Sequence, residues 1–234
     1  MEEIFYSNYY VKLASAYARG VEIRTGNYKL CPKEILDKNL DEMREEESVI
    51  LLDNCRKENI KLYPFKSMHD ELPRVKKVIG FLKSITFESL LDVGSGRGVF
   101  LFPFLNDFSW VETTSLDILE NRVVFLNDLK LGGISNLTPI LADICSAEIP
   151  NKSVDVVTML EVLEHIPDVK KAILSAVKIA KKYIIITVPS KPDDNPEHIR
   201  LLTKEWLENY FYELGYEKLK FDAVSGHTVL IVTL

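Results

Sequence analysis

Three glycines at alternate positions follow a short apolar run in the middle of the chain. The run ends in Asp92 and Val93, and Gly94, Gly96 and Gly98 come directly after it. Glycine allows positive backbone φ angles and lets a ligand approach the main chain closely. An apolar pattern resumes after the last glycine. The stretch therefore predicts a strand, a tight turn and a helix whose first N–H groups are free to bind a ligand.

The positions of the acid and of the third glycine separate two classes of ligand. Dinucleotide-binding turns read G-x-G-x-x-G and place a pyrophosphate on the helix N-terminus. Here Gly98 comes one residue early, and Val99 stands where the third glycine would be. A carboxylate at Asp92 is unfavourable beside a pyrophosphate but suits a ligand that carries an ammonium group. The turn therefore favours such a ligand, and a dinucleotide-dependent oxidoreductase is the weaker alternative.

The segment L-D-V-G-S-G-R-G, which begins at Leu91, resembles the first motif of class I S-adenosylmethionine (SAM) methyltransferases. The resemblance covers roughly residues 74–234. It implies an enzyme that transfers a methyl group from SAM, most simply to an oxygen of a small molecule or of a ribose. A SAM-binding regulator without catalytic activity would keep the same cofactor residues and is an alternative. The residues implied at the methionine end and ribose side of SAM are Asp92, Gly94, Gly96 and Gly98.

Two acids at the ends of later predicted strands extend this predicted site. Asp117 lies 19 residues after Gly98, at the end of a predicted strand. An acid at that place binds ribose hydroxyls in both ligand classes, although an aspartate there can also cap the next helix. In similar methyltransferases the acid after the following strand binds the adenine amino group. The resemblance therefore implies that adenosine is contacted by Asp117, Ile118, Asp143 and Ile144.

A second motif, M-L-E-V-L-E-H, begins at Met159 after the fourth predicted strand. If its last five residues form one helical turn, its two glutamates and its histidine share a face. The motif resembles those of quinone-biosynthesis O-methyltransferases and of RNA 3′-terminal 2′-O-methyltransferases. In the RNA enzymes these three residues and a downstream histidine bind a divalent metal. That resemblance implies a metal site made of Glu161, Glu164, His165 and His198.

The same residues have a second interpretation without metal. Glu164 and His165 are the predicted catalytic residues, and His165 could act as a general base by itself. In relatives without metal, the glutamate that corresponds to Glu161 contacts the methionine end of SAM or fixes the loop after the fourth strand. The RNA enzymes also carry a second downstream histidine that we do not find here. His69 and His227 are isolated in the sequence, and we expect surface or core roles for both.

Strand and helix patterns alternate from Pro73 to the C-terminus, which is typical of an α/β fold. The resemblance implies a Rossmann-like, seven-stranded class I methyltransferase sheet with helices on both faces. Residues 1–73 are predicted to be a helical N-terminal cap, with a long charged helix over residues 33–59, and residues 74–234 the SAM-binding methyltransferase domain. The cap is expected to pack on the main domain or to close over the substrate as a lid.

Composition limits the class of partner. The net charge of −6 has no basic arm to attract nucleic acid, so a small-molecule acceptor is favoured over RNA. No apolar run approaches the roughly 18 residues of a membrane helix. The acidic N-terminus is unlike a signal peptide, and three widely spaced cysteines indicate neither a disulfide framework nor a zinc knuckle. We therefore expect a cytoplasmic protein without membrane association; the oligomeric state stays open.

Overall fold

The computed structural model describes residues 9–234. Its strands are β1 (Ser89–Val93), β2 (Glu112–Asp117), β3 (Leu137–Leu141), β4 (Val154–Leu160), β5 (Ala180–Pro189), β6 (Leu219–Val224) and β7 (His227–Thr233). Its α-helices are α2 (Val11–Thr25), α3 (Lys33–Leu36), α4 (Glu45–Lys57), α5 (Pro73–Leu82), α6 (Leu101–Asp107), α7 (Glu120–Leu131), α8 (Val169–Ile179) and α9 (Lys204–Glu213). Short 3-10 turns are η1 (Leu40–Glu42), η2 (Tyr63–Phe65), η3 (Ser67–Glu71) and η4 (Leu163–His165).

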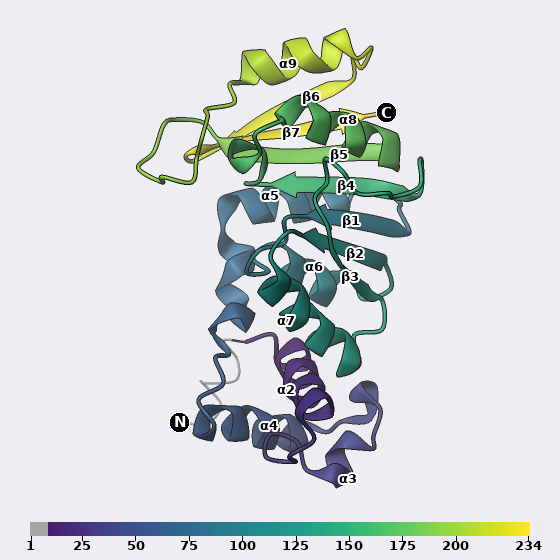
Figure 1. Ribbon diagram of the computed structural model, residues 1–234, viewed down its shortest axis with the longest axis vertical. Helices are drawn as coiled ribbons and strands as arrows, with labels where there is room; N and C mark the ends of the chain where they lie inside the picture. Colours follow the sequence, from purple (N-terminus) through teal and green to yellow (C-terminus); the bar gives the residue numbers. More distant parts are fainter. Residues whose placement is uncertain (1–8) are drawn as a thin grey trace.

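The seven strands form one sheet in the order β3-β2-β1-β4-β5-β7-β6 (Figure 1). Strands β1 to β5 pair in parallel, whereas β7 runs antiparallel to both β5 and β6. All seven predicted strands are present, and the closing pair contains the expected antiparallel strand. The predicted fold class is therefore confirmed. Because β2, β1 and β4 are neighbours, their carboxyl ends meet at one edge of the sheet.

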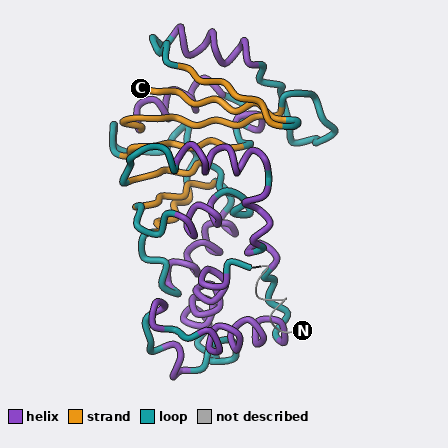
Figure 2. Tube along the Cα trace, turned by 180° about the vertical axis from the view of Figure 1, so that it is seen from behind, coloured by secondary structure: helices purple, strands orange, loops and turns teal. Residues whose placement is uncertain are grey.

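Helices cover both faces of the sheet because its central strands are apolar on both sides. Leu90 of β1 packs with α5 and with Phe104 of α6 on one face, whereas the next residue, Leu91, packs with α8 and α9 on the other. Figure 2, from the opposite side to Figure 1, shows helices lying over the strands there too. Thr203 caps α9 as predicted, because its hydroxyl accepts a hydrogen bond from the backbone N–H of Trp206 at 3.1 Å.

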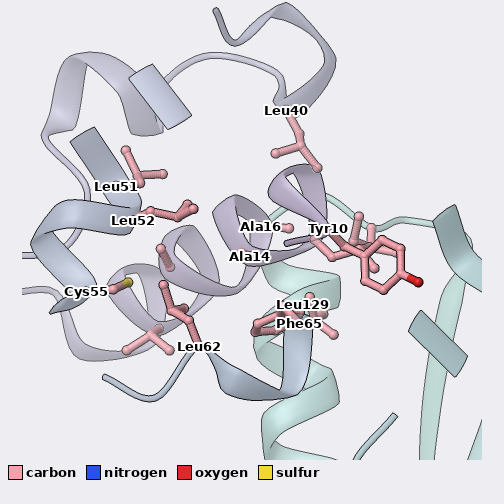
Figure 3. Close-up of a cluster of buried hydrophobic side chains, with 14 of the residues drawn as sticks. Tyr10, Ala14, Ala16, Leu40, Leu51, Leu52, Cys55, Leu62, Phe65 and Leu129 are labelled. Atoms are coloured by element: carbon pink, nitrogen blue, oxygen red, sulfur yellow. The ribbon is translucent and has the colours of Figure 1, made fainter. Parts of the chain in front are cut away.

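The N-terminal helices pack at the β3 side of the sheet, where α2 lies along α7 (Figure 1). At Gly20 an added Cβ would lie 1.6 Å from the carbonyl oxygen of Asp128, so only glycine permits this helix approach. Arg24 of α2 also makes a bidentate ion pair with the buried Asp128, at 2.7 and 2.9 Å. A shared apolar cluster, drawn in Figure 3, joins Leu51, Leu52 and Phe65 to Leu129 of α7.

The predicted long helix over residues 33–59 is wrong, because the chain there forms α3, η1 and α4 as separate pieces. Arg19 of α2 is the physical reason. Its buried guanidinium donates hydrogen bonds to the backbone carbonyls of Ile35 (2.7 Å), Leu36 (3.2 Å) and Lys38 (2.6 Å). Those carbonyls would accept bonds from the next helical turn in a continuous helix, so the tertiary contact replaces the helix at this point.

Within residues 9–234, none of the helices combines the length and the apolar character needed to cross a bilayer.

Candidate functional site

The glycine turn lies at the carboxyl edge of the sheet, between β1 and α6. Gly94, Gly96 and Gly98 all have positive φ angles, of 68°, 53° and 77°, a conformation that other residue types rarely adopt. A Cβ on Gly98 would come within 2.4 Å of the Phe102 ring. The three glycines are therefore required by backbone conformation, and at Gly98 by packing as well.

Asp92 lies beneath this turn and is almost completely buried. Its Oδ1 accepts a hydrogen bond of 2.7 Å from the Thr158 hydroxyl on the neighbouring strand β4. Burial raises the pKa of Asp92 to about 6, and the hydrogen bonds from Ser95 and Thr158 oppose that shift. The carboxyl is therefore mainly ionised at neutral pH, and it lines a cavity beside the turn.

Asp117 ends β2, next to β1 in the sheet. Its two carboxylate oxygens accept hydrogen bonds from the backbone N–H groups of Gly96 (3.0 Å) and Leu119 (2.9 Å). Leu119 is the residue before α7, so the carboxylate does support the helix start, the role that competes with ribose binding. Each oxygen keeps a second lone pair, and Asp117 with its exposed neighbour Ile118 lines a larger cavity at this edge.

Two adjoining cavities contain the predicted cofactor residues except Gly98, which lines neither of them. The smaller is lined by Asp92 and the glycine turn, and the larger by Asp117, Ile118, Asp143 and Ile144. Gly94, Gly96 and Glu161 line both, so the two form one continuous site along the carboxyl edge of the sheet.

Arg74 was missed by the sequence analysis. It follows Pro73 in the first turn of α5 and lines the smaller cavity together with Asp92 and Glu161. Arg97 of the glycine turn lines it as well, so the cavity presents two cations and two acids. The sequence offers only Pro73 as a signal there, which marks a helix start and says nothing about a ligand.

Glu161 takes a different position from the one that a helical turn predicts. Its φ is 57°, so it lies outside η4 and does not share a face with Glu164 and His165. Its Oε1 accepts a 2.7 Å hydrogen bond from the Thr187 hydroxyl, and its Oε2 lies 3.2 Å from Nε2 of His227. His227 is thus not isolated, as the sequence suggested, but contacts a residue of the site.

Glu164, His165 and His198 come together: potential ligand atoms of the three lie within 4.8 Å of one another. The rings of the two histidines are 4.7 Å apart, and Nε2 of His198 is 4.0 Å from Oε1 of Glu164. Glu164 is 1% exposed, and neither of its carboxylate oxygens has a hydrogen-bond partner. Burial accordingly raises its pKa to about 8. A buried acid without partners is costly unless it is protonated or paired with a cation.

Both imidazoles are oriented through their Nδ1 atoms. Nδ1 of His165 lies 2.9 Å from the backbone carbonyl of Glu197, and Nδ1 of His198 lies 2.9 Å from the Asp193 carboxylate. Such partners hold the proton on Nδ1 and leave Nε2 with its lone pair, as is usual for histidines that bind metals. The donor set of one carboxylate and two imidazoles therefore fits a divalent metal, with three of the four predicted ligands and without Glu161.

Comparison with known proteins agrees with the geometry. The family model described as a methyltransferase domain matches residues 57–220. The ubiquinone biosynthesis O-methyltransferase of Cupriavidus pinatubonensis is 33% identical over 104 residues, which are 44% of this chain and 41% of that protein. The alignment thus spans less than half of the relative's length.

Solved structures share the fold at low sequence identity. A SAM-dependent methyltransferase from Aquifex aeolicus superposes with a TM-score of 0.55 at 18% identity, over 72% of this chain and 93% of that one. The [4+2]-cyclase SpnF superposes with a TM-score of 0.60 at 16% identity, over 68% of this chain and 79% of that one. The family match covers most of the chain and the strand order agrees with it. The chain therefore belongs to the class I SAM-dependent methyltransferase family.

Proposed function

We propose that this protein transfers the methyl group of SAM to an oxygen atom of a small-molecule acceptor. One observation carries the proposal: a continuous site whose charges match the parts of SAM in order. The smaller cavity offers two cations and two acids to the zwitterionic methionine end, and the larger offers an acid at the end of β2 and another after β3 to the adenosine. A dinucleotide lacks the ammonium group that the two acids of the smaller cavity would bind.

At the methionine end, the guanidinium of Arg74 would bind the carboxylate of SAM. Asp92 and Glu161 would receive its ammonium group, since ionised partners make the stronger hydrogen bonds. The glycines let the backbone approach the ligand at this point.

At the adenosine end, Asp117 would accept hydrogen bonds from the ribose hydroxyls with its remaining lone pairs. Ile118 and Ile144 would contact the adenine ring, and Asp143 would accept a hydrogen bond from the adenine amino group. The backbone N–H of Cys145 already holds the Asp143 carboxylate at 2.8 Å, which fixes its direction.

The reaction needs little covalent assistance from the protein. The acceptor oxygen forms a bond to the methyl carbon as the bond between that carbon and sulfur breaks, the sulfonium becomes a neutral thioether, and the acceptor loses a proton. Holding both reactants in line can supply about 7–11 kcal/mol of the barrier. The lone pair on Nε2 of His165, which lines the larger cavity, is positioned to take the proton. The neighbouring carboxyl group of Glu164 would be either negatively charged or protonated in the same step.

As the alternative to His165 acting as a base by itself, we propose a divalent metal held by Glu164, His165 and His198. In that case the lone pair on Nε2 of His165 would bind the ion and would not take the proton. When bound, such an ion lowers the pKa of a coordinated hydroxyl and so makes it a better nucleophile. Two imidazoles and one carboxylate suit a transition metal or zinc. The two unpartnered, buried oxygens of Glu164 support this proposal.

The name of the Cupriavidus relative supports an oxygen acceptor, and the net charge of −6 disfavours a polyanion such as RNA. A cytoplasmic location is supported by the three cysteines, Cys31, Cys55 and Cys145, which are all unpaired. A second function deserves a test because SpnF, which shares the fold, is named as a [4+2]-cyclase and not as a methyltransferase. The fold thus accommodates other reactions.

Calorimetry with SAM, S-adenosylhomocysteine (SAH) and NAD tests the cofactor, and we expect the first two to bind and NAD not to. Incubation with methyl-labelled SAM and a panel of catechols, phenols and carboxylates then tests the reaction. Label in an acceptor is the expected result. Tight NAD binding without a response to SAM would refute the proposal. SAM binding without transfer to any class of acceptor would favour a regulator or another reaction.

A further inference from the structure

Glu161 is anchored to the neighbouring strand by both its backbone and its side chain. Its N–H donates a 2.9 Å hydrogen bond to the carbonyl of Thr187, and its Oε1 accepts a 2.7 Å bond from the hydroxyl of the same residue. It also has a positive φ, which residues with a Cβ rarely adopt. Such a conformation persists only where surrounding contacts hold it.

His227 holds the other carboxylate oxygen from a different strand. Its Nε2 lies 3.2 Å from Oε2 of Glu161. The position of the imidazole is fixed by the sheet, because His227 begins β7 and pairs with Pro189 of β5. The turn before it is tied to β5 as well, since the carbonyl of Gly226 accepts a 2.9 Å hydrogen bond from the N–H of Ser190.

We propose that His227 is a positioning residue that, with Thr187, holds the Glu161 carboxylate where it receives the ammonium group of SAM. This inference rests on the proposed function. Glu161 is the side chain that lines both cavities of the site, so its direction decides what the methionine end meets. The Thr187 hydroxyl contacts Oε1 and the His227 imidazole contacts Oε2. The other lone pairs of both oxygens are left for the ligand.

Arg74 makes this restraint important. It lines the same cavity as Glu161. A Glu161 carboxylate released from His227 could turn to the Arg74 guanidinium, and the ion pair would remove one acid and one cation from the cavity that receives the zwitterion of SAM. The 3.2 Å contact with His227 therefore keeps these two charges apart and available.

The test compares two ligands that differ only at the amino-acid end. SAH carries the ammonium and carboxylate groups, whereas 5′-methylthioadenosine lacks both. We expect His227→Ala to weaken SAH binding by about ten- to thirtyfold, as for the loss of one close polar contact to a charged group, and to leave 5′-methylthioadenosine binding unchanged. His227→Gln, whose amide nitrogen reaches close to the place of Nε2, should restore most of the SAH affinity. Ser225→Ala, in the same turn and exposed, is the matched control and should change neither.

A double variant tests whether His227 acts through Glu161. In a Glu161→Gln background, His227→Ala should cause little further loss, because coupled residues are not additive. Equal losses for both ligands, no loss for SAH, no recovery with glutamine, or full additivity would each overturn the inference while the proposed function stood. Failure of the wild-type protein to bind SAH would instead overturn the proposed function, and the inference with it.

Discussion

Replacing Glu164 by glutamine should make the metal-free protein more stable at pH 8 and leave its stability nearly unchanged at pH 4. The variant keeps the shape of the side chain but cannot ionise. In the wild-type protein burial raises the pKa of Glu164 to about 8, and no other described residue donates a hydrogen bond to its carboxylate oxygens. The unfolded chain would ionise with a pKa near 4.3. Protonated Glu164 therefore favours the folded state.

The sign and size follow from these two values. A pKa that is higher in the folded state gives stability that is fully present below the unfolded pKa and is lost as pH rises through the folded pKa. Each unit of difference corresponds to about 1.4 kcal/mol. The free energy of unfolding should thus fall by roughly 3–5 kcal/mol between pH 4 and pH 8 from this residue.

Urea unfolding at several pH values, in the presence of a chelator, measures the effect. The difference between Glu164→Gln and wild type should grow steadily from pH 5 to pH 8. Glu148→Gln, at an exposed position, is the matched control and should show no such growth. Parallel pH profiles for Glu164→Gln and wild type would mean that Glu164 is solvated or paired in solution, and the reasoning about its burial would be refuted.

Three further expectations follow from the site. Asp117→Ala should weaken SAH binding by about one to three powers of ten, measured by calorimetry, and unchanged affinity would contradict ribose binding there. Gly98→Ala should lower the free energy of unfolding by more than Gly226→Ala, because both positions have positive φ but only Gly98 meets a ring, that of Phe102; the strain alone costs about 1–2 kcal/mol. Adding zinc or manganese should raise the Tm of wild type at pH 8 but not of His198→Ala, and an equal rise in both would contradict the metal site.

Much of the fold was predictable because its signals are local. Apolar segments mark the central strands β1, β4 and β5, and Asp117 and Asp143 end or follow β2 and β3, so the cofactor edge could be placed from the sequence. The glycine turn was recognisable for the same reason, since Gly94, Gly96 and Gly98 all need positive φ.

The parts that were not predictable depend on contacts between distant segments. Arg19 breaks the expected long helix by binding carbonyls 16 to 19 residues away. Arg74 and His227 reach the site from α5 and from β7, and no spacing in the sequence relates them to Glu161. Glu161 itself was assigned to a helical turn, but its hydrogen bonds to Thr187 hold it in a positive-φ conformation that a periodic pattern cannot express.

The close packing of α2 against α7 limits how the N-terminal part of this protein can be truncated or exchanged with that of a relative. The family match begins at residue 57, inside the last turn of α4. A fragment starting there would lack α2, and Phe102, Phe125 and Leu129 would lose the side chains that cover them. A fragment without α2 would therefore expose apolar side chains of α6 and α7. Helix α2 cannot be exchanged for that of a relative unless the new helix also brings a glycine opposite Asp128.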